Sequence, residues 1–298
     1  TKGVKFPENL LCVGKRLILR RALQEVLKKT RGAYPAPLKA IEAVRASSKP
    51  IEKGLALERK LFAECAKSSE AKSLTSLFFL DKEARSKDWL PGVKVGVPKK
   101  IGIIGAGIMG SGIAYAAISS NIPVVLHDTF PEPVGKAVIF IETMFGKAVK
   151  MGKMTAEEAA AKRRLLKVST GNDLSALADT DFVIEAIIED LQLKRKMFAE
   201  LEKVVSPQTV IATNTSSFLP SDLAAELQHK DRFCATHFFN PVHKMPLIEV
   251  AATPESSPET VAKALTLTKA IGKTPVLLDR ECPGLIVNRV LVTGMAWA

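Results

Sequence analysis

The sequence predicts an α/β fold, with a mostly parallel sheet covered by helices on both faces, preceded by an all-helical segment. Between residues 100 and 282, short apolar runs rich in Val and Ile alternate with longer stretches of helical periodicity, which is the pattern of βαβ units. Residues 1–86 show helical periodicity and no strand-like alternation. A stretch rich in Pro and Gly separates the two regions and predicts a linker over 87–99.

The helical segment is expected to contain four helices. Apolar residues recur at helical spacing over 9–30, and Gly32 and the Pro35–Pro37 stretch interrupt that pattern. Further helices are expected over 37–48, 51–68 and 69–86.

Seven strands and six helices are expected to alternate in the α/β region. The expected strands are 101–104, 124–128, 181–187, 209–217, 233–239, 247–252 and 274–279. The expected helices are 107–120, 133–152, 155–164, 190–205, 220–228 and 257–271. Residues 283–298 predict the start of a further, truncated helical domain. Because the chain begins with Thr and ends inside an apolar helical pattern, we expect it to be a piece of a longer polypeptide.

The positive charge of the chain is concentrated in its first third. The net charge is +12, and residues 1–95 hold 21 Lys and Arg against 10 Asp and Glu, whereas residues 96–298 hold 22 against 21. The aromatic and Arg pattern of an RNA-binding module is absent, so no nucleic-acid partner is expected. Attraction of a polyanionic substrate and an ordinary solvated helix face both remain open. The four cysteines, at 12, 65, 234 and 282, are spaced too irregularly to predict a metal site or a disulfide framework.

A glycine-rich turn predicts a dinucleotide site. Gly105, Gly107 and Gly110 follow the first strand and open a helix; they suit a tight turn, a close approach to a pyrophosphate, and helix–strand packing. The helix N-terminus offers free N–H groups to phosphates. Asp128 ends the next strand, where its carboxylate would bind ribose hydroxyls and repel a 2′-phosphate. The context therefore predicts a Rossmann-type domain that binds NAD in preference to NADP.

Two polar groups predict the chemistry. His237 lies at the end of one expected strand and Glu249 lies in the next, so adjacent strands would pair a histidine base with a carboxylate. A histidine among aromatic residues is also compatible with a core role, but Glu249 in an apolar strand requires a partner. The 214–217 cluster, Asn-Thr-Ser-Ser, ends another strand, where α/β sheets bind ligands. Helix capping is the alternative for this cluster.

From Lys100 onward, the chain resembles 3-hydroxyacyl-CoA dehydrogenases. The resemblance rests on the motifs IGIIGAGIMGSGIA, VIEAIIEDLQLKRKMF, ATNTSS, HFFNPVHKMPLIEV and PGLIVNRVL, in family order. It implies that His237 is the catalytic base and Glu249 its partner. The remaining implied contacts are those of Ser216, Asn240 and Asn288 with the thioester substrate and nicotinamide, and those of Glu189 and Lys194 with the cofactor.

Residues 1–95 resemble the helical tail of an enoyl-CoA hydratase/isomerase domain, through RGAYPAPLKAIEAVRAS and LERKLFAECAKSSEAKSLTSLFF. Together the two regions resemble the α-subunit type of fatty-acid β-oxidation multifunctional enzyme. This implies an acyl-CoA thioester substrate, a possible thiolase subunit as partner and a possible homo-oligomer. The hydratase core is missing, so no hydratase activity is expected. The bacterial cytoplasm is the expected location, with the mitochondrial matrix or peroxisome as alternatives.

Two rival interpretations remain from the sequence. One is a Rossmann dehydrogenase acting on small hydroxy acids, of the 3-hydroxyisobutyrate type. The other is an NAD-binding but catalytically incomplete fragment with an assembly or scaffold role.

Overall fold

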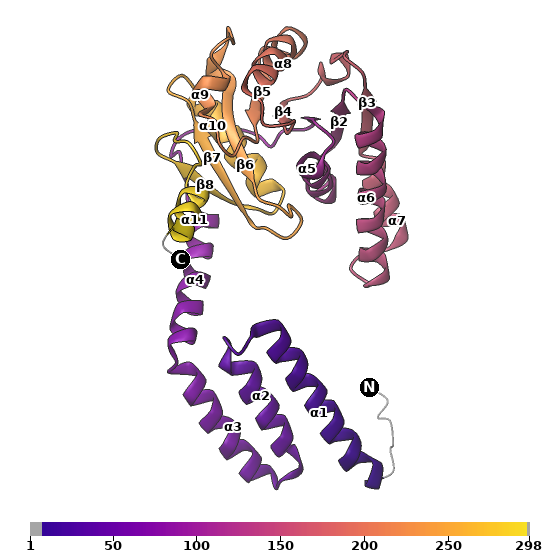
Figure 1. The fold of residues 1–298 in the computed structure, drawn as a ribbon, viewed down its shortest axis with the longest axis vertical. Coiled ribbons are helices and arrows are strands. Elements are labelled where there is room, and N and C mark those ends of the chain that lie inside the picture. Colours follow the sequence, from indigo (N-terminus) through magenta and orange to yellow (C-terminus); the bar gives the residue numbers. More distant parts are fainter. Residues whose placement is uncertain (1–7, 297–298) are drawn as a thin grey trace. The chain divides into compact units, whose positions relative to one another are not determined.

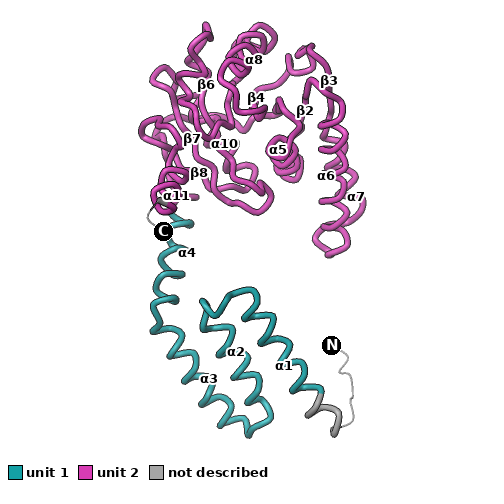
Figure 2. Tube along the Cα trace, in the orientation of Figure 1, with its two compact units in different colours: residues 1–83 teal, residues 84–298 magenta. Residues whose placement is uncertain are grey.

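The computed structural model describes residues 8–296 of the chain. The chain consists of two compact units, residues 1–83 and 84–298, and the boundary lies inside helix α4 (Ser69–Ser86) (Figure 2). Residues 1–7 and 297–298, which the predicted first and last segments include, lie outside the described residues, as does the side chain of Cys12. Within the described residues, no helix is long and apolar enough to cross a membrane.

The first unit is all-helical, as the sequence predicted. Helices α1 (Glu8–Thr30), α2 (Pro35–Arg45) and α3 (Ile51–Ala66) precede α4. Helix α2 packs against both α1 and α3 (Figure 1). Among its described side chains, the buried hydrophobic residues of this unit are few: Leu19, Ala46 and Leu61.

The second unit is built on one sheet of eight strands in the order β3-β2-β1-β4-β5-β6-β7-β8. The strands are β1 (Ile101–Ile104), β2 (Val124–Asp128), β3 (Leu166–Thr170), β4 (Phe182–Glu185), β5 (Val210–Thr213), β6 (Phe233–Phe238), β7 (Leu247–Ala252) and β8 (Thr274–Leu278). All neighbouring strands are parallel except β6 and β7. The first six follow the Rossmann order, which reverses between β1 and β4 and places a ligand crevice there. The predicted fold class is confirmed.

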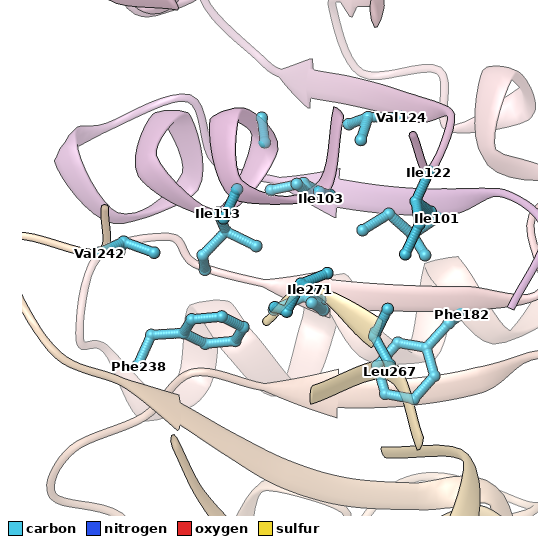
Figure 3. Close-up of a cluster of buried hydrophobic side chains, with 14 of the residues drawn as sticks. Ile101, Ile103, Ile113, Ile122, Val124, Phe182, Phe238, Val242, Leu267 and Ile271 are labelled. Carbon is cyan, nitrogen blue, oxygen red and sulfur yellow. The ribbon is translucent and has the colours of Figure 1, made fainter. Parts of the chain in front are cut away.

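Helices cover both faces of this sheet. The helices of the unit are α5 (Ile108–Ser119), α6 (Pro131–Lys150), α7 (Ala156–Arg163), α8 (Leu191–Val204), α9 (Pro220–Leu223), α10 (Pro258–Ala270) and α11 (Val287–Ala296). On one face, residues of α5, α6, α7 and α10 pack with the strands in the main core, where Ile113, Phe238 and Ile271 gather (Figure 3). On the other face, Phe198 and Leu201 of α8 and Leu223 of α9 pack in a second cluster.

The structure differs from the predicted elements in several places. The strands expected over 181–187 and 209–217 are shorter and end at Glu185 and Thr213. Strand β3 was not predicted, because as an edge strand it has an exposed, polar sequence rather than an apolar run. The helix expected over 220–228 ends at Leu223. The expected linker 87–99 contains no helix or strand, yet its Trp89 and Leu90 pack against the main core.

Candidate active site

The glycine loop after β1 has the geometry of a phosphate-binding turn. Gly105 has a φ of +100°, and a Cβ there would lie 2.5 Å from the carbonyl oxygen of Ala186. A Cβ on Gly110 would lie 1.8 Å from the carbonyl oxygen of Gly105. Around Gly107, in contrast, no atom lies within 4 Å of such a Cβ. Gly105 and Gly110 are therefore required by the fold, whereas Gly107 leaves space beside the N-terminus of α5.

Two cavities flank this loop, and Gly107 lines both. The larger, of about 750 Å³, is lined by Asp128, Ala186, Ile187 and Ile188 among others. The Asp128 carboxylate is held by the N–H groups of Ala106 (2.8 Å) and Phe130 (3.0 Å). The space at Gly107, the free N–H groups of α5 and a fixed carboxylate fit the pyrophosphate and ribose of a dinucleotide.

The smaller cavity, of about 430 Å³, lies on the other side of the glycine loop. It is lined by Gly107, Ser111, Lys136, Phe140, Asn240 and His243, with apolar neighbours. Asn240 follows the end of β6, so this cavity adjoins the segment that carries His237. A dinucleotide bound at Gly107 would therefore adjoin both cavities.

His237 and Glu249 form a buried pair across antiparallel strands β6 and β7. They are directly opposite in the register, and His237 Nδ1 lies 2.7 Å from Glu249 Oε2. The side chains are 7% and 1% exposed. The contact predicted from the sequence is confirmed. Because an ionised carboxylate only accepts hydrogen bonds, Nδ1 is the donor in this contact, and in the neutral imidazole Nε2 is then the acceptor.

Glu249 has a second set of partners at the start of α11. Its Oε1 accepts hydrogen bonds from the N–H groups of Ile286 and Val287, each at 2.9 Å. Burial alone would raise the pKa of Glu249, but the hydrogen bonds from His237, Val287 and Ile286 outweigh it and hold this pKa below its ordinary value. Glu249 therefore stays ionised and fixes the imidazole ring.

The structure brings two of the three predicted substrate residues together. Asn288, in the first turn of α11, has its Nδ2 3.5 Å from the carbonyl oxygen of Ser216. Ser216 is partly exposed in the loop after β5. Asn240 is exposed and lines the smaller cavity. Their predicted contacts with substrate remain predictions.

Glu189 and Lys194 also lie together. Lys194 Nζ is 3.1 Å from Glu189 Oε2, and Glu189 Oε1 accepts the N–H groups of Ser216 (3.0 Å) and Ser217 (3.2 Å). Charged residues at the start of a helix are usually solvated, but Lys194 is buried. Its ammonium also contacts the buried Glu185. The contact of either residue with the cofactor remains a prediction.

Comparison with known proteins decides the family. The family model of the 3-hydroxyacyl-CoA dehydrogenase NAD-binding domain matches residues 100–282. The chain belongs to this family. Its cofactor is NAD, which the glycine loop and Asp128 would hold.

Solved structures of this family agree. A 3-hydroxybutyryl-CoA dehydrogenase from Escherichia coli is 39% identical with a TM-score of 0.63, covering 66% of this chain and 41% of the other; this chain thus spans less than half of that enzyme. An (S)-3-hydroxybutyryl-CoA dehydrogenase from Ralstonia eutropha is 35% identical with a TM-score of 0.63, covering 67% and 73%. The dehydrogenase part of multifunctional enzyme 1 from C. elegans, at 23% identity and a TM-score of 0.57, covers 67% and 48% and shows the fold alone.

Of the residues that shape this site, Asn214 was predicted only as part of the 214–217 cluster, and Glu185 was not singled out from the sequence. Asn214 Oδ1 accepts the N–H of Phe238 at 2.8 Å, which ties the end of β5 to the residue after His237. Glu185 ends β4 and is fully buried. A carboxylate closing an apolar strand was the available signal, since the same argument had identified Glu249.

Proposed function

We propose that this chain oxidises the C3 hydroxyl group of a 3-hydroxyacyl-CoA, with NAD as hydride acceptor, as a step of fatty-acid β-oxidation. The observation that carries the proposal is the buried His237–Glu249 pair at 2.7 Å. Three residues after His237, Asn240 lines a cavity that shares Gly107 with the larger cavity. A base beside a nicotinamide site is the arrangement that alcohol oxidation requires.

In the proposed reaction, each site residue has a separate role. His237 Nε2 removes the hydroxyl proton, and the C3–H bond breaks as the carbonyl forms. NAD, when bound, supplies the acceptor for that hydride. Glu249, kept ionised by its hydrogen bonds, stabilises the imidazolium that His237 becomes. Ser216 and Asn288, which lie against each other, orient the hydroxyl and thioester groups.

Positive charge beside the smaller cavity supports an anionic thioester substrate. The pKa of His243 lies below its ordinary value, because of partial burial and then the charges of Lys244, Lys273 and Lys147. Lys136 lines the same cavity. Such a surface attracts the phosphates of coenzyme A. The Escherichia coli and Ralstonia relatives are named for 3-hydroxybutyryl-CoA, so we extend the CoA-ester class to this chain.

The decisive test is NADH oxidation on addition of acetoacetyl-CoA. His237→Gln should lower kcat by about 10²- to 10⁴-fold, the value of a general base, while NADH still binds by fluorescence. Free acetoacetate is the matched substrate control, and it should not be reduced. Equal rates with the free acid would favour a small-hydroxy-acid dehydrogenase, and NADH binding without turnover would favour an NAD-binding fragment with an assembly role.

A further inference from the structure

Polar residues at and after the ends of β4 and β5, together with Lys194 of α8, form a closed ring of contacts whose members are buried except for the exposed Glu189. Lys194 contacts Glu185 and lies 3.1 Å from Glu189. Thr215 Oγ1 donates to Glu189 Oε1 at 2.5 Å. The N–H of Thr215 donates to Thr213 Oγ1 at 3.2 Å, and Thr213 Oγ1 donates to Glu185 Oε2 at 2.7 Å. Glu185 therefore reaches the 215–217 loop by two routes, one through Lys194 and one through Thr213.

Burying the polar groups of this ring costs free energy. Glu185, Thr213 and Thr215 are 0% exposed and Lys194 is 1% exposed. Burial raises the pKa of Glu185 although Lys194 opposes that rise. Apolar residues of similar volume are often no less stabilising than a buried ion pair, so stability alone is a weak reason for charges here. Charge-assisted hydrogen bonds instead hold the participating side chains in a defined orientation.

Glu185 also holds the cofactor side of the site. Its Oε1 accepts the N–H of Ile187 at 2.8 Å, and Ile187 lines the larger cavity. Through the ring, the same carboxylate is connected to Glu189. Glu189 Oε1 accepts a hydrogen bond from Ser217 Oγ at 3.0 Å as well as those from the loop N–H groups. The Glu185 side chain therefore bonds to a residue that lines the larger cavity and connects, through the ring, to the loop of Ser216.

We propose that Glu185 is a positioning residue that fixes the Ser216 loop relative to the cofactor cavity, acting through Lys194 and Thr213. The inference deepens the proposed dehydrogenase function and rests on it for its catalytic consequence. Glu185→Gln removes the charge that Lys194 faces while keeping the size of the side chain. The loop would lose its fixed partner, and a small displacement of a positioning group costs on the order of 10-fold or more in rate.

The first measurements are kcat with acetoacetyl-CoA, the NADH dissociation constant, and hydrogen exchange over residues 213–218, all on the full chain. We expect Glu185→Gln to lower kcat about 10-fold, to change NADH affinity less than about 3-fold, and to speed exchange of the loop amides. Glu226→Gln, at an exposed position after α9, is the matched control and should change none of these. Unchanged exchange in the loop of Glu185→Gln would overturn the proposal.

A double variant distinguishes a positioning role of Glu185 from a loss of activity that is unrelated to the Ser216 loop. If Glu185 acts through the loop, Ser216→Ala should lower kcat much less in the Glu185→Gln background than in the wild type, because residues acting as a unit are not additive. Multiplicative losses would contradict the inference.

Two milder variants test the same role in case Glu185→Gln fails to fold. Thr213→Val removes one route of the ring, and Thr213→Ser retains its hydroxyl. We expect the Val variant to show a smaller loss of kcat and faster loop exchange, and the Ser variant to match the wild type. A wild type that turns over no acyl-CoA would refute the proposed function alone, since loop exchange in the variants still tests the positioning role.

Discussion

Gly107 and Gly110 allow binding and folding to be separated by two alanine substitutions in one loop. At Gly110, the added Cβ would lie 1.8 Å from the Gly105 carbonyl oxygen and 2.9 Å from its carbonyl carbon. Both are backbone atoms, so α5 must shift. Overpacking of this kind costs about 3 kcal/mol or more, and at about 2–4 °C per kcal/mol for a domain of this size Tm should fall by about 6–12 °C.

At Gly107 the same methyl group has no neighbour within 4 Å, and φ is −68°, which alanine adopts freely. Gly107→Ala should keep Tm within about 2 °C, since such substitutions usually change stability by less than about 0.5 kcal/mol. It should nevertheless weaken NADH binding by about 10-fold or more, or about 1.4 kcal/mol, because the methyl group enters the space of the pyrophosphate. The assays are thermal unfolding and NADH fluorescence titration. Wild-type NADH affinity in Gly107→Ala would refute this account of the loop.

Two further predictions concern buried ionisable groups. The pKa of Glu249 is held below its ordinary value of 4.5, so its stabilisation is complete above that pH and is lost as pH falls through the folded-state pKa. Glu249→Gln should therefore lower the free energy of unfolding by about 1–3 kcal/mol at neutral pH, and thermal unfolding should show a smaller difference in Tm between variant and wild type in acid. A difference in Tm that does not change with pH would contradict this. Burial raises the pKa of Cys234 to about 12, so iodoacetamide should modify the partly exposed Cys65 and Cys282 while Cys234 reacts only on unfolding; mass spectrometry of native and denatured samples would show equal labelling if this is wrong.

Regular patterns in the sequence predicted most of the sheet and its main site. The apolar runs predicted seven of the eight strands because those strands are covered on both faces. Strand β3 was not predicted because Lys167 and Thr170 are exposed at the sheet edge, so the segment has no apolar run. It is a strand because it pairs with β2. The helix expected over 220–228 likewise ends at Leu223 although the local periodicity continues, and beyond it the N–H groups of Gln228 and His229 donate to Glu202 of α8.

The candidate site was predictable where the chemistry was local and hidden where it was not. A carboxylate in an apolar strand predicted the pairing of Glu249 with His237. The same reasoning was available for Glu185, but its partner, Lys194, lies on a helix after an irregular segment. No spacing rule predicts that a lysine on this helix points inward, because the outcome depends on how α8 packs on the sheet.

The register of β6 and β7 places His237 and Glu249, the proposed base and its partner, within one short segment of the chain. His237 and Glu249 face each other across one antiparallel pair, and the segment joining the two strands supplies Asn240 and His243 to the smaller cavity. The proposed base, the carboxylate that orients it and part of the cavity wall are thus encoded by one short stretch of chain. Recombination between relatives with crossovers before Phe233 and after Ala252 would move this chemistry as a block, leaving the cofactor loop of the host unchanged.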